Sequence, residues 1–382
     1  MTDINKLLNR AVDEAINGEH IRFVLESGKK LRVKLGIDPT ASDLHLGHAV
    51  VLRKLRQFQE LGHKIVLIIG DFTARVGDPS GRSEERKPLS KKAIEKNMKK
   101  YLEQAGKIID VKKTEVRHNS EWLEKPSIIP ELASKISVQQ VLEREDFQKR
   151  VKEGSPITVL EELYPLLQGY DSVAVKADIE IGGTDQKFNL LMGRRVQRAY
   201  GMPEQDIMTL ALIEGTDGSR KMSKSYGNYI SLSVKPEDMF GKIMSIPDAL
   251  MDKYYTALTD LDFPKNLQAR DAKLKLAKEI TASIHGEKKA GKAEAEFVRV
   301  FSKKEMPNEM PVVKISSPRI TALGLILEAG FADSKGEARR LILQGGAKIN
   351  ERVLKDPIEI VSVKNGDVLR AGKKRFARFE IP

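Results

Sequence analysis

The first half of the chain alternates short apolar runs with longer stretches of helical periodicity. After the first run, apolar side chains recur at Val51, Leu52, Leu55 and Phe58, which is the spacing of one helix face. Repetition of strand, loop and helix predicts an α/β fold, a Rossmann-like, doubly wound sheet of parallel strands. The predicted strands cover residues 31–35, 64–69, 177–181 and 207–213.

Each predicted strand is followed by a polar loop. The loops read GIDPTASD, GDFTARVGDPSGRSEERKPLS, GGTDQ and GTDGSRKMSKS. In a parallel α/β sheet the binding loops lie at the carboxyl ends of the strands, along one edge. We therefore expect these four loops to contribute to a single site.

The rest of the chain divides into three parts. Helical periodicity dominates after about residue 233, and the later stretch KKEMPNEMPVVKISSP has the prolines typical of a linker. The last segment predicts a helix over 319–329, a second helix opened by Ser334 and Glu337 as a capping box, and short strands with a hairpin turn at Asn365-Gly366. The predicted parts are an α/β domain at 1–232, a helical domain at 233–305, a linker at 306–316 and a small α+β module at 317–382.

Composition indicates an ordinary soluble protein. Of 382 residues, 40% are hydrophobic and 31% charged, and the absence of cysteine excludes disulfides, cysteine zinc sites and thiol nucleophiles. The polar N-terminus lacks the apolar core of a signal peptide, and no apolar run is long enough to span a bilayer, so we expect a cytoplasmic protein without a membrane partner. The net charge of +12 favours a polyanionic partner such as nucleic acid, but general solubility explains it equally well.

Two histidines one turn apart are the first candidate for chemistry. His45 and His48 are three residues apart at the predicted start of a helix, so they share a face, and Gly47 between them leaves the backbone open to a ligand. The helix N-terminus also offers free N–H groups to phosphate. This combination suits a nucleotide, although two surface histidines on an amphipathic helix would give the same pattern.

The string KMSKS is the more specific signal. Lys221 and Lys224 lie in a Gly- and Ser-rich loop after a predicted buried strand. Two lysines three residues apart can follow the negative charge that develops on a departing pyrophosphate. The alternative is a solvated basic loop. The chain has no Gly-x-Gly and no Gly-Lys-Ser/Thr, so it carries neither a dinucleotide fingerprint nor a P-loop.

The two motifs together resemble the paired signatures of class I aminoacyl-tRNA synthetases. The resemblance narrows to the bacterial tyrosyl-tRNA synthetases and covers nearly the whole chain, through the stretches GIDPTASDLHLGH, GDPSGRSEER, YPLLQGYDS, GGTDQKFNLL and KMSKS. In YPLLQGYD, residues Tyr164, Gln168 and Asp171 share one helix face. Taken alone, that stripe is also what an ordinary helix beside a core would show.

The resemblance implies roles for individual residues. It implies that Asp171 accepts the phenol proton of tyrosine and that Asp185 binds ribose hydroxyls. The implied phosphate and catalytic residues are Thr40, His45, His48, Lys221 and Lys224; the implied ATP-binding residues are Asp38, Gly47, Gly183, Asp185, Met222 and Lys224; the implied tyrosine-binding residues are Asp78, Tyr164, Gln168, Asp171 and Gln186; and Arg82 and Arg86 lie in an implied mobile basic loop.

Two positions depart from the family pattern. Many members have a tyrosine that touches the substrate hydroxyl where this chain has Lys34, before Leu35 and Gly36. The second partner of the phenol is therefore left open. Arg82 stands where relatives often carry lysine, which keeps the charge but changes the geometry.

The C-terminal module resembles the S-four-type RNA-binding domain. The pattern is carried by FADSKGEARRLILQGGAKIN and NGDVLRAG. The implied phosphate contacts are Lys335, Arg339, Arg340, Lys373, Lys374 and Arg375. With this module the basic net charge favours RNA over general solubility.

These resemblances imply tyrosine–tRNA ligase activity. The expected substrates and partners are ATP with Mg²⁺, L-tyrosine and tRNA(Tyr), with no dedicated protein metal site, in a homodimer. The alternatives are a tryptophanyl-type enzyme, which shares fold and reaction, and a non-catalytic RNA-binding protein built on a synthetase-like fold.

Overall fold

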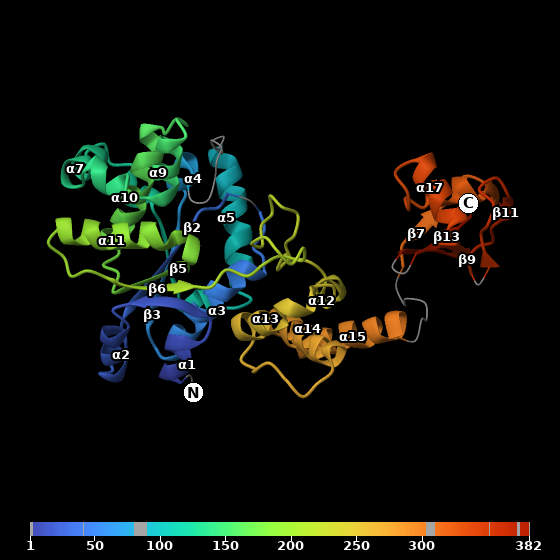
Figure 1. The fold of residues 1–382 in the computed structure, drawn as a ribbon, viewed down its shortest axis with the longest axis horizontal. Coiled ribbons are helices and arrows are strands. Elements are labelled where there is room, and N and C mark those ends of the chain that lie inside the picture. The colour runs from blue at the N-terminus through green and yellow to red at the C-terminus, as the bar shows by residue number, and fades with distance from the viewer. Residues whose placement is uncertain are drawn as a thin grey trace. The chain divides into compact units, whose positions relative to one another are not determined.

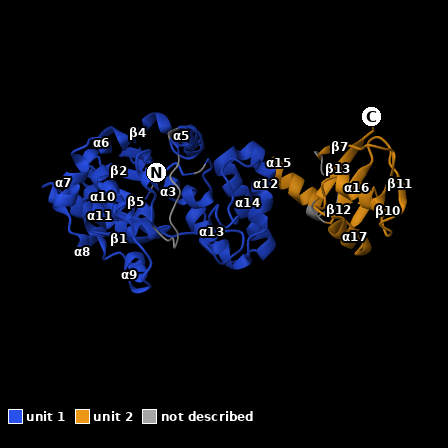
Figure 2. Cartoon of the chain, turned by 90° about the horizontal axis from the view of Figure 1, so that it is seen from above, with its two compact units in different colours: residues 1–291 blue, residues 292–382 orange. Residues whose placement is uncertain are grey.

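The computed structural model describes residues 3–40, 42–79, 90–302, 310–350, 352–372 and 375–381. The chain forms two compact units, residues 1–291 and residues 292–382 (Figure 2). This division falls inside the stretch predicted as one helical domain, and the four-part division stays a prediction. Arg82, Arg86, Lys373, Lys374 and part of the predicted linker lie outside the described residues.

A six-stranded sheet organises the first unit and confirms the predicted doubly wound α/β fold (Figure 1). Its strand order is β1-β6-β5-β2-β3-β4, in which β2 to β6 pair in parallel and β1 pairs antiparallel with β6. The strands are β1 Val12–Ile16, β2 Arg32–Ile37, β3 Lys64–Ile69, β4 Glu115–His118, β5 Ile179–Gly183 and β6 Asp206–Leu210. The order of the strands reverses between β2 and β5: β3 and β4 follow on one side of β2, whereas β5 and β6 lie on the other side. Ligands bind at this switch point in doubly wound folds.

The four predicted strands are the central ones, and the two edge strands were not predicted. Central strands are covered on both faces and read as apolar runs, as in KIVLII of β3. The edge strands β1 (VDEAI) and β4 (EVRH) are half exposed and rich in charge, so hydrophobic pattern does not distinguish them from loops.

Helices cover the sheet and leave its carboxyl edge open. Helices α10 and α11 pack together over β5, and their apolar side chains form a core with Val66 and Ile68 of β3. Helix α3 packs against β3 and β5 and carries its own buried face. The helices of this part are α1 Ile4–Asn9, α2 Gly18–Glu26, α3 Leu46–Glu60, α4 Thr73–Val76, α5 Lys91–Ala105, α6 Ser120–Leu123, α7 Ile128–Lys135, α8 Val138–Val141, α9 Glu145–Lys152, α10 Val159–Ala174 and α11 Lys187–Ala199.

The stretch after the sheet is helical. Its helices are α12 Pro236–Met244, α13 Met251–Leu258, α14 Ala269–His285 and α15 Glu287–Phe297. Phe240, Tyr254 and Leu276 are fully buried among them. Within the described residues, no helix has the length and apolar character that crossing a membrane requires.

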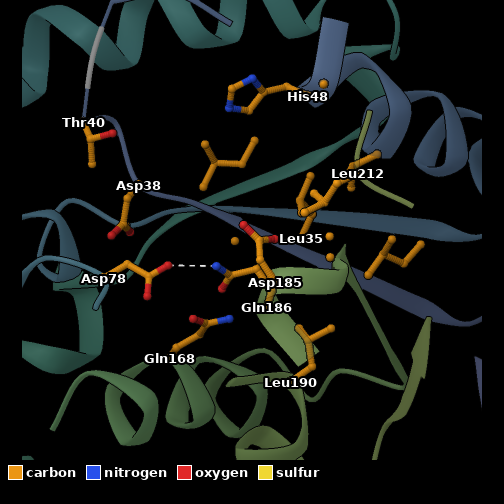
Figure 3. Close-up of a pocket in the computed structure, with 18 of the residues that line it drawn as sticks. Leu35, Asp38, Thr40, His48, Asp78, Gln168, Asp185, Gln186, Leu190 and Leu212 are labelled. Atoms are coloured by element: carbon orange, nitrogen blue, oxygen red, sulfur yellow. Dashed lines mark hydrogen bonds between the residues drawn. The ribbon is translucent and has the colours of Figure 1, made fainter. Parts of the chain in front are cut away.

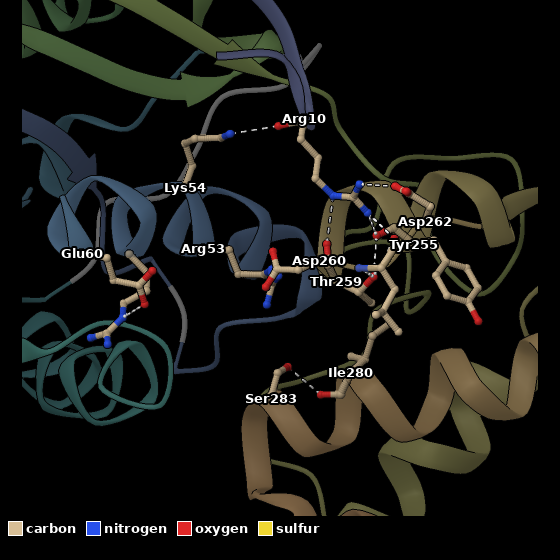
Figure 4. A network of polar contacts seen from close by, with 12 residues as sticks. Arg10, Arg53, Lys54, Glu60, Tyr255, Thr259, Asp260, Asp262, Ile280 and Ser283 are labelled. Atoms are coloured by element: carbon tan, nitrogen blue, oxygen red, sulfur yellow. Dashed lines mark hydrogen bonds and ion pairs between the residues drawn. The ribbon is translucent and has the colours of Figure 1, made fainter. Parts of the chain in front are cut away.

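A polar network fastens α13 and the loop after it to α1 and α3 (Figure 4). Arg10 donates to the carbonyl of Thr259 at 3.1 Å and pairs with Asp262 at 2.9 Å. Arg53 of α3 pairs with Asp260 at 2.9 Å. Lys54, also on α3, is 3% exposed and donates to the carbonyls of Leu7 and Arg10. These contacts fix the orientation of α3, whose N-terminus carries the two histidines.

The second unit contains the predicted small α+β module. Strands pair in the order β10-β9-β12-β13-β7, and β11 pairs with β8. The strands are β7 Val312–Lys314, β8 Arg319–Thr321, β9 Ala347–Ile349, β10 Arg352–Val353, β11 Ile360–Ser362, β12 Val368–Ala371 and β13 Arg375–Glu380, and the helices are α16 Ala322–Glu328 and α17 Lys335–Leu343.

Details of the sequence prediction for this module are wrong in two places. The first helix begins at Ala322, because Arg319–Thr321 forms strand β8. The Asn365-Gly366 turn does not join a hairpin, because β11 pairs with β8 while β12 pairs with β9 and β13. The cap of α17 is confirmed in part: Ser334 Oγ accepts from the Glu337 N–H at 3.2 Å, but the Glu337 carboxylate accepts from the Asp333 N–H.

Candidate active site

A cavity of about 760 Å³ opens at the carboxyl ends of the central strands (Figure 3). Loops after β2, β3, β5 and β6 all reach it, as the sequence predicted. It is lined by the predicted site residues Asp38, Thr40, His45, Gly47, His48, Asp78, Tyr164, Gln168, Asp171, Gly183, Asp185, Gln186, Lys221 and Met222. We call the part around His45, His48, Asp185 and Lys221 the histidine end, and the part around Asp38, Asp78, Tyr164, Gln168 and Asp171 the aspartate end.

Lys224, the other predicted residue of this site within the described part of the chain, does not line the cavity. Lys224 lies near it: its Nζ is 5.7 Å from the ring centroid of Tyr101, and its charge lowers the pKa of both His45 and His48. Arg82 and Arg86 are not among the described residues. The predicted RNA-binding residues belong to the second unit.

Backbone pairing brings together the motif that contains His45 and His48 and the motif KMSKS. The Leu46 N–H donates to the carbonyl of Ile230 at 3.0 Å, and the Leu232 N–H donates to the carbonyl of Leu44 at 2.9 Å. The segment directly after KMSKS is thereby bound to the segment that contains His45. This pairing explains how motifs almost 180 residues apart in the sequence reach one cavity.

Local geometry fixes the histidines. His45 precedes α3 with extended backbone, and its N–H donates to His48 Nδ1 at 3.2 Å. The two ring centroids are 4.0 Å apart. A Cβ on residue 47 would lie 3.0 Å from the His45 ring, so Gly47 makes room for the imidazole as well as for a ligand.

Both imidazoles are neutral at physiological pH. Burial lowers the pKa of His48 to about 4, with a further contribution from Lys224. Burial, followed by His48, Lys224 and Lys221, lowers the pKa of His45 to about 2. These side chains therefore offer hydrogen bonds to a polar ligand while the lysines supply the positive charge.

The KMSKS segment is held by Asn228. Its Oδ1 accepts from the Ser223 N–H at 2.8 Å, and its Nδ2 donates to the carbonyl of Lys221 at 3.2 Å. A Cβ on residue 215 would lie 2.2 Å from the Asn228 side chain, so Gly215 is required for this contact. Lys221 Nζ lies 3.1 Å from Asp185 Oδ2, so the predicted phosphate-binding lysine pairs with the predicted ribose-binding carboxylate.

At the aspartate end, Asp171 is 3% exposed and held by two donors. Trp122 Nε1 donates to its Oδ1 at 2.8 Å, and Asn119 Nδ2 lies 3.4 Å from its Oδ2. Burial raises the pKa of Asp171 to about 7, while Lys34, Trp122 and Asn119 act in the opposite direction. A carboxylate in this setting is a fixed acceptor for a buried hydroxyl group.

Asp38 belongs to the same end. Tyr164 donates its phenol O–H to Asp38 Oδ2 at 3.0 Å, and Thr73 Oγ1 donates to Oδ1 at 2.7 Å. Burial raises the pKa of Asp38 to about 7 and that of Tyr164 well above its usual value. The structure therefore places the Asp38 carboxylate beside a predicted tyrosine-binding residue, although the resemblance implied an ATP-binding role.

Asp78 and Gln186 form a second pair at this end. Gln186 Nε2 donates to Asp78 Oδ2 at 2.8 Å, as the dashed line in Figure 3 marks. Asn189 Nδ2 donates to Gln186 Oε1 at 3.0 Å, and Arg144 lies 4.0 Å from Asp78. Together with Asp38 and Asp171, Asp78 gives this end of the cavity a group of carboxylates, an arrangement suited to a cationic group.

The sequence did not predict several polar residues that hold this site. Asn119 and Trp122 follow β4, the edge strand that the pattern did not reveal. Trp122 is the only tryptophan in the chain, which would have been a signal for it. Thr73, Asn228 and Glu180 carry no such signal, because their roles arise from contacts with residues distant in the sequence.

Comparison with known proteins assigns the family. Residues 26–302 match the family described as tRNA synthetases class I (W and Y). The chain belongs to this family of class I aminoacyl-tRNA synthetases. Residues 325–368 match the S4 domain. Both matches confirm the resemblances inferred from the motifs.

Individual relatives of this synthetase family agree. The chain is 53% identical to the tyrosine–tRNA ligase of Thermotoga maritima, over 98% of this chain and 96% of that protein. It is 48% identical to that of Moorella thermoacetica, over 98% and 94%. Among solved structures, a C-terminally truncated mitochondrial tyrosyl-tRNA synthetase of Aspergillus nidulans has a TM-score of 0.66 at 20% identity, covering 78% of this chain and 94% of that one. At such identity this likeness shows the fold alone.

Proposed function

We propose that the protein is a tyrosine–tRNA ligase. The observation that carries the proposal is the buried Asp171 at one end of a cavity whose other end holds His45, His48 and Lys221. A phenol placed against Asp171 would donate its O–H to this carboxylate, whereas the ring of a bound phenylalanine would leave that acceptor site without a donor, which is costly. The relatives named tyrosine–tRNA ligases, which match nearly the full chain, support the same conclusion.

The first step of the proposed reaction joins tyrosine to ATP. A carboxylate oxygen of tyrosine attacks the α-phosphorus, the bond from that phosphorus to the β-phosphate bridge breaks, and pyrophosphate leaves. The nucleophile is already an anion, so catalysis rests on positioning and on stabilising the charge that develops. Thr40, His45, His48, Lys221 and Lys224 bind the phosphates, and Mg²⁺ accompanies ATP. Asp185 with Gly47, Gly183 and Met222 holds adenosine.

The amino acid occupies the aspartate end. Asp78, Tyr164 and Gln168 surround its ammonium, and the carboxylate of Asp38, which bonds to Tyr164, adds negative charge there. Gln186 lies beside the substrate carboxylate. In the second step, a ribose hydroxyl at the 3′ end of tRNA attacks the tyrosyl carbonyl and AMP leaves.

Amino-acid-dependent exchange of pyrophosphate into ATP tests the amino acid. We expect exchange with tyrosine and none with tryptophan. Exchange that responds only to tryptophan would identify a tryptophanyl enzyme, and exchange with neither would favour the non-catalytic alternative.

The second unit is proposed to bind tRNA(Tyr). Lys335, Arg339 and Arg340 are exposed on α17, whereas Arg375 donates to the carbonyl of Phe331. Replacing Arg339 and Arg340 by alanine should weaken tRNA binding and reduce its salt dependence by about one unit of slope per lost contact. Lys364→Ala, on an exposed turn of the same unit, is the control. An unchanged slope in the double variant would place the tRNA contact elsewhere.

We also propose a homodimer that works in the cytoplasm. Five apolar side chains are exposed on the neighbouring helices α7 to α10, at Ile129, Val138, Val151, Val159 and Leu160, with Val159 72% exposed. Large exposed apolar side chains on helices of one region support a protein interface there. Sedimentation should show a dimer that Val138→Asp/Val159→Asp converts to a monomer, whereas Phe23→Asp on α2 should not.

A further inference from the structure

A buried ion pair lies directly behind the aspartate end. The Lys34 side chain on β2 is 0% exposed and that of Glu180 on β5 is 1% exposed, and Lys34 Nζ is 2.8 Å from Glu180 Oε1. The same ammonium donates to Ser172 Oγ at 2.8 Å and to the carbonyl of Gln168 at 3.1 Å. All three of its N–H groups are therefore satisfied within the protein.

The ion pair reaches the cavity in two ways: Glu180 itself lines it, and Gln168, which contacts both members of the pair, lines it as well. Glu180 Oε1 is 3.5 Å from Nε2 of Gln168, a long contact. Its Oε2 accepts from Ser172 Oγ at 3.2 Å and from Gln205 Nε2. A carboxylate can only accept, so it draws the amide nitrogen of Gln168 toward itself and turns the amide oxygen away.

The surrounding backbone is shaped to hold this network. A Cβ on residue 193 of α11 would lie 2.5 Å from Gln205 Nε2 and 3.1 Å from Glu180 Oε2. Gly193 thus leaves room for the network where α11 passes the ion pair. Burying two charges is costly, and a pair of apolar side chains of similar volume would stabilise the fold as well or better. This cost indicates a role other than stability.

We propose that Lys34 and Glu180 are positioning residues for the amino acid. Glu180 orients the Gln168 amide so that its oxygen faces the substrate ammonium. Lys34 holds the Glu180 carboxylate in place through the ion pair, and its charge lowers the pKa of Asp171. The proposal rests on the proposed function, since it assumes that tyrosine occupies this end.

The charge of Lys34 acts on Asp171 in a defined environment. Among the described residues, the titratable groups found to interact with Asp171 are Lys34 from β2, Glu180 from β5, Asp38 from the loop after β2 and Tyr164 from α10. Among these, Lys34 is the cation, and it lowers the pKa of Asp171 while Glu180 raises it. Without Lys34, Asp171 would be protonated at higher pH and would lose its preference for a hydroxyl donor.

Two variants test the two parts of the proposal in the full-length enzyme. For Glu180→Gln, the probes are tyramine, which has the ammonium, and 3-(4-hydroxyphenyl)propionate, which lacks it, both as competitors of tyrosine in pyrophosphate exchange. We expect the variant to bind tyramine at least about tenfold more weakly and the propionate unchanged, because only the ammonium contact is lost. Equal weakening of both probes would overturn the orienting role.

For Lys34→Met, the readout is the pH dependence of the tyrosine KM. We expect the rise of KM at low pH to begin about one pH unit or more higher than in the wild type, and the preference for tyrosine over phenylalanine at pH 7 to fall about tenfold. The wild-type profile and preference in this variant would refute the role of Lys34. The matched control is Lys273→Met on α14, another buried lysine, which bonds to the carbonyl of Ile246 and to Asp248.

A double variant, Lys34→Met/Glu180→Leu, guards against misfolding of the single ones, because it removes both charges together. This double variant should retain the fold and lose the preference for tyrosine over phenylalanine, as expected for Lys34→Met. A double variant with wild-type preference also contradicts the proposal. Absence of tyrosine-dependent exchange in the wild type would instead refute the proposed function, and the two failures are therefore distinguishable.

Discussion

The two ends of the cavity differ in how deeply their charged side chains are buried. At the histidine end, the side chains of Asp185, in the short 3₁₀ turn after β5, and of Lys221, in the loop after β6, are 29% and 39% exposed. At the aspartate end, Asp171 is 3% exposed and Glu180 1%, and each carboxylate is held by several donors. A phosphate chain changes its charge distribution during reaction, so it needs accessible charge. A phenol and an ammonium have fixed shapes, so they are best met by groups that are already in place.

This difference in burial predicts whether a substitution changes catalysis alone or catalysis and stability together. Exposed charge contributes little to folding, so its removal should affect the reaction rate or ATP binding alone. Buried polar groups contribute to both stability and selectivity, so their removal should affect tyrosine binding and unfolding together.

The largest effect is expected for Lys224→Ala at the histidine end. Loss of one charged group that stabilises developing charge costs about 10²–10³-fold in rate. The exchange kcat should fall by this factor, while the tyrosine KM and the Tm change little. Lys235→Ala, an exposed lysine before α12, is the control. A kcat close to that of the control would remove Lys224 from the catalytic set.

At the aspartate end, Asp171→Asn should produce the next largest loss of activity. The amide keeps the bond from Trp122 but replaces the charged acceptor of the phenol, which is worth about 1–3 kcal/mol or roughly 5–150-fold in kcat/KM for tyrosine. The kcat/KM for phenylalanine should change much less. Equal losses for the two amino acids would show that Asp171 does not read the hydroxyl group.

The pH dependence of tyrosine binding gives a smaller effect. The pKa of Asp171 is about 7, so the ionised acceptor is lost as the pH falls below that value, and the tyrosine KM should rise by up to about tenfold per unit. Stability has the opposite trend: the pKa of Asp171 in the folded protein lies above its usual value of 3.8, so its contribution to stability is present below pH 3.8 and lost as the pH rises through about 7.

A control separates Asp171 from Asp38, whose pKa is also about 7. The tyrosine KM of Asp171→Asn should lose most of its pH dependence between pH 6 and 8, whereas Asp38→Asn should retain it. The reverse result would assign the titration to Asp38.

The smallest effect is expected for Asp185→Ala. The variant removes the predicted ribose contact, but it also frees Lys221 from its partner, and these changes partly offset each other in ATP binding. We expect the KM for ATP to rise by less than about tenfold and the KM for tyrosine to stay constant. A change in the tyrosine KM as large as that for ATP would show that the two ends do not act separately.

Much of the fold could be predicted because it depends on local pattern. The four central strands are apolar runs, and α3 and α10 have helical periodicity, so the doubly wound sheet was recognisable. The edge strands β1 and β4 and the pairing of β11 with β8 were missed, because exposed strands and distant partners leave little trace in a local pattern.

The sequence by itself determined the histidine end of the site. His45, Gly47 and His48 are adjacent in the chain, as are Lys221 and Lys224, and motifs of this length are informative without knowledge of any contact. At the aspartate end the motifs named Asp171, but only the tertiary structure decided how it is held: Trp122 donates to it, and the charges of the paired Lys34 and Glu180 act on it from separate strands. The physical reason is that phosphate recognition uses a few consecutive groups at a helix start and a loop, whereas a buried polar network exists only where strands and helices distant in the sequence pack together.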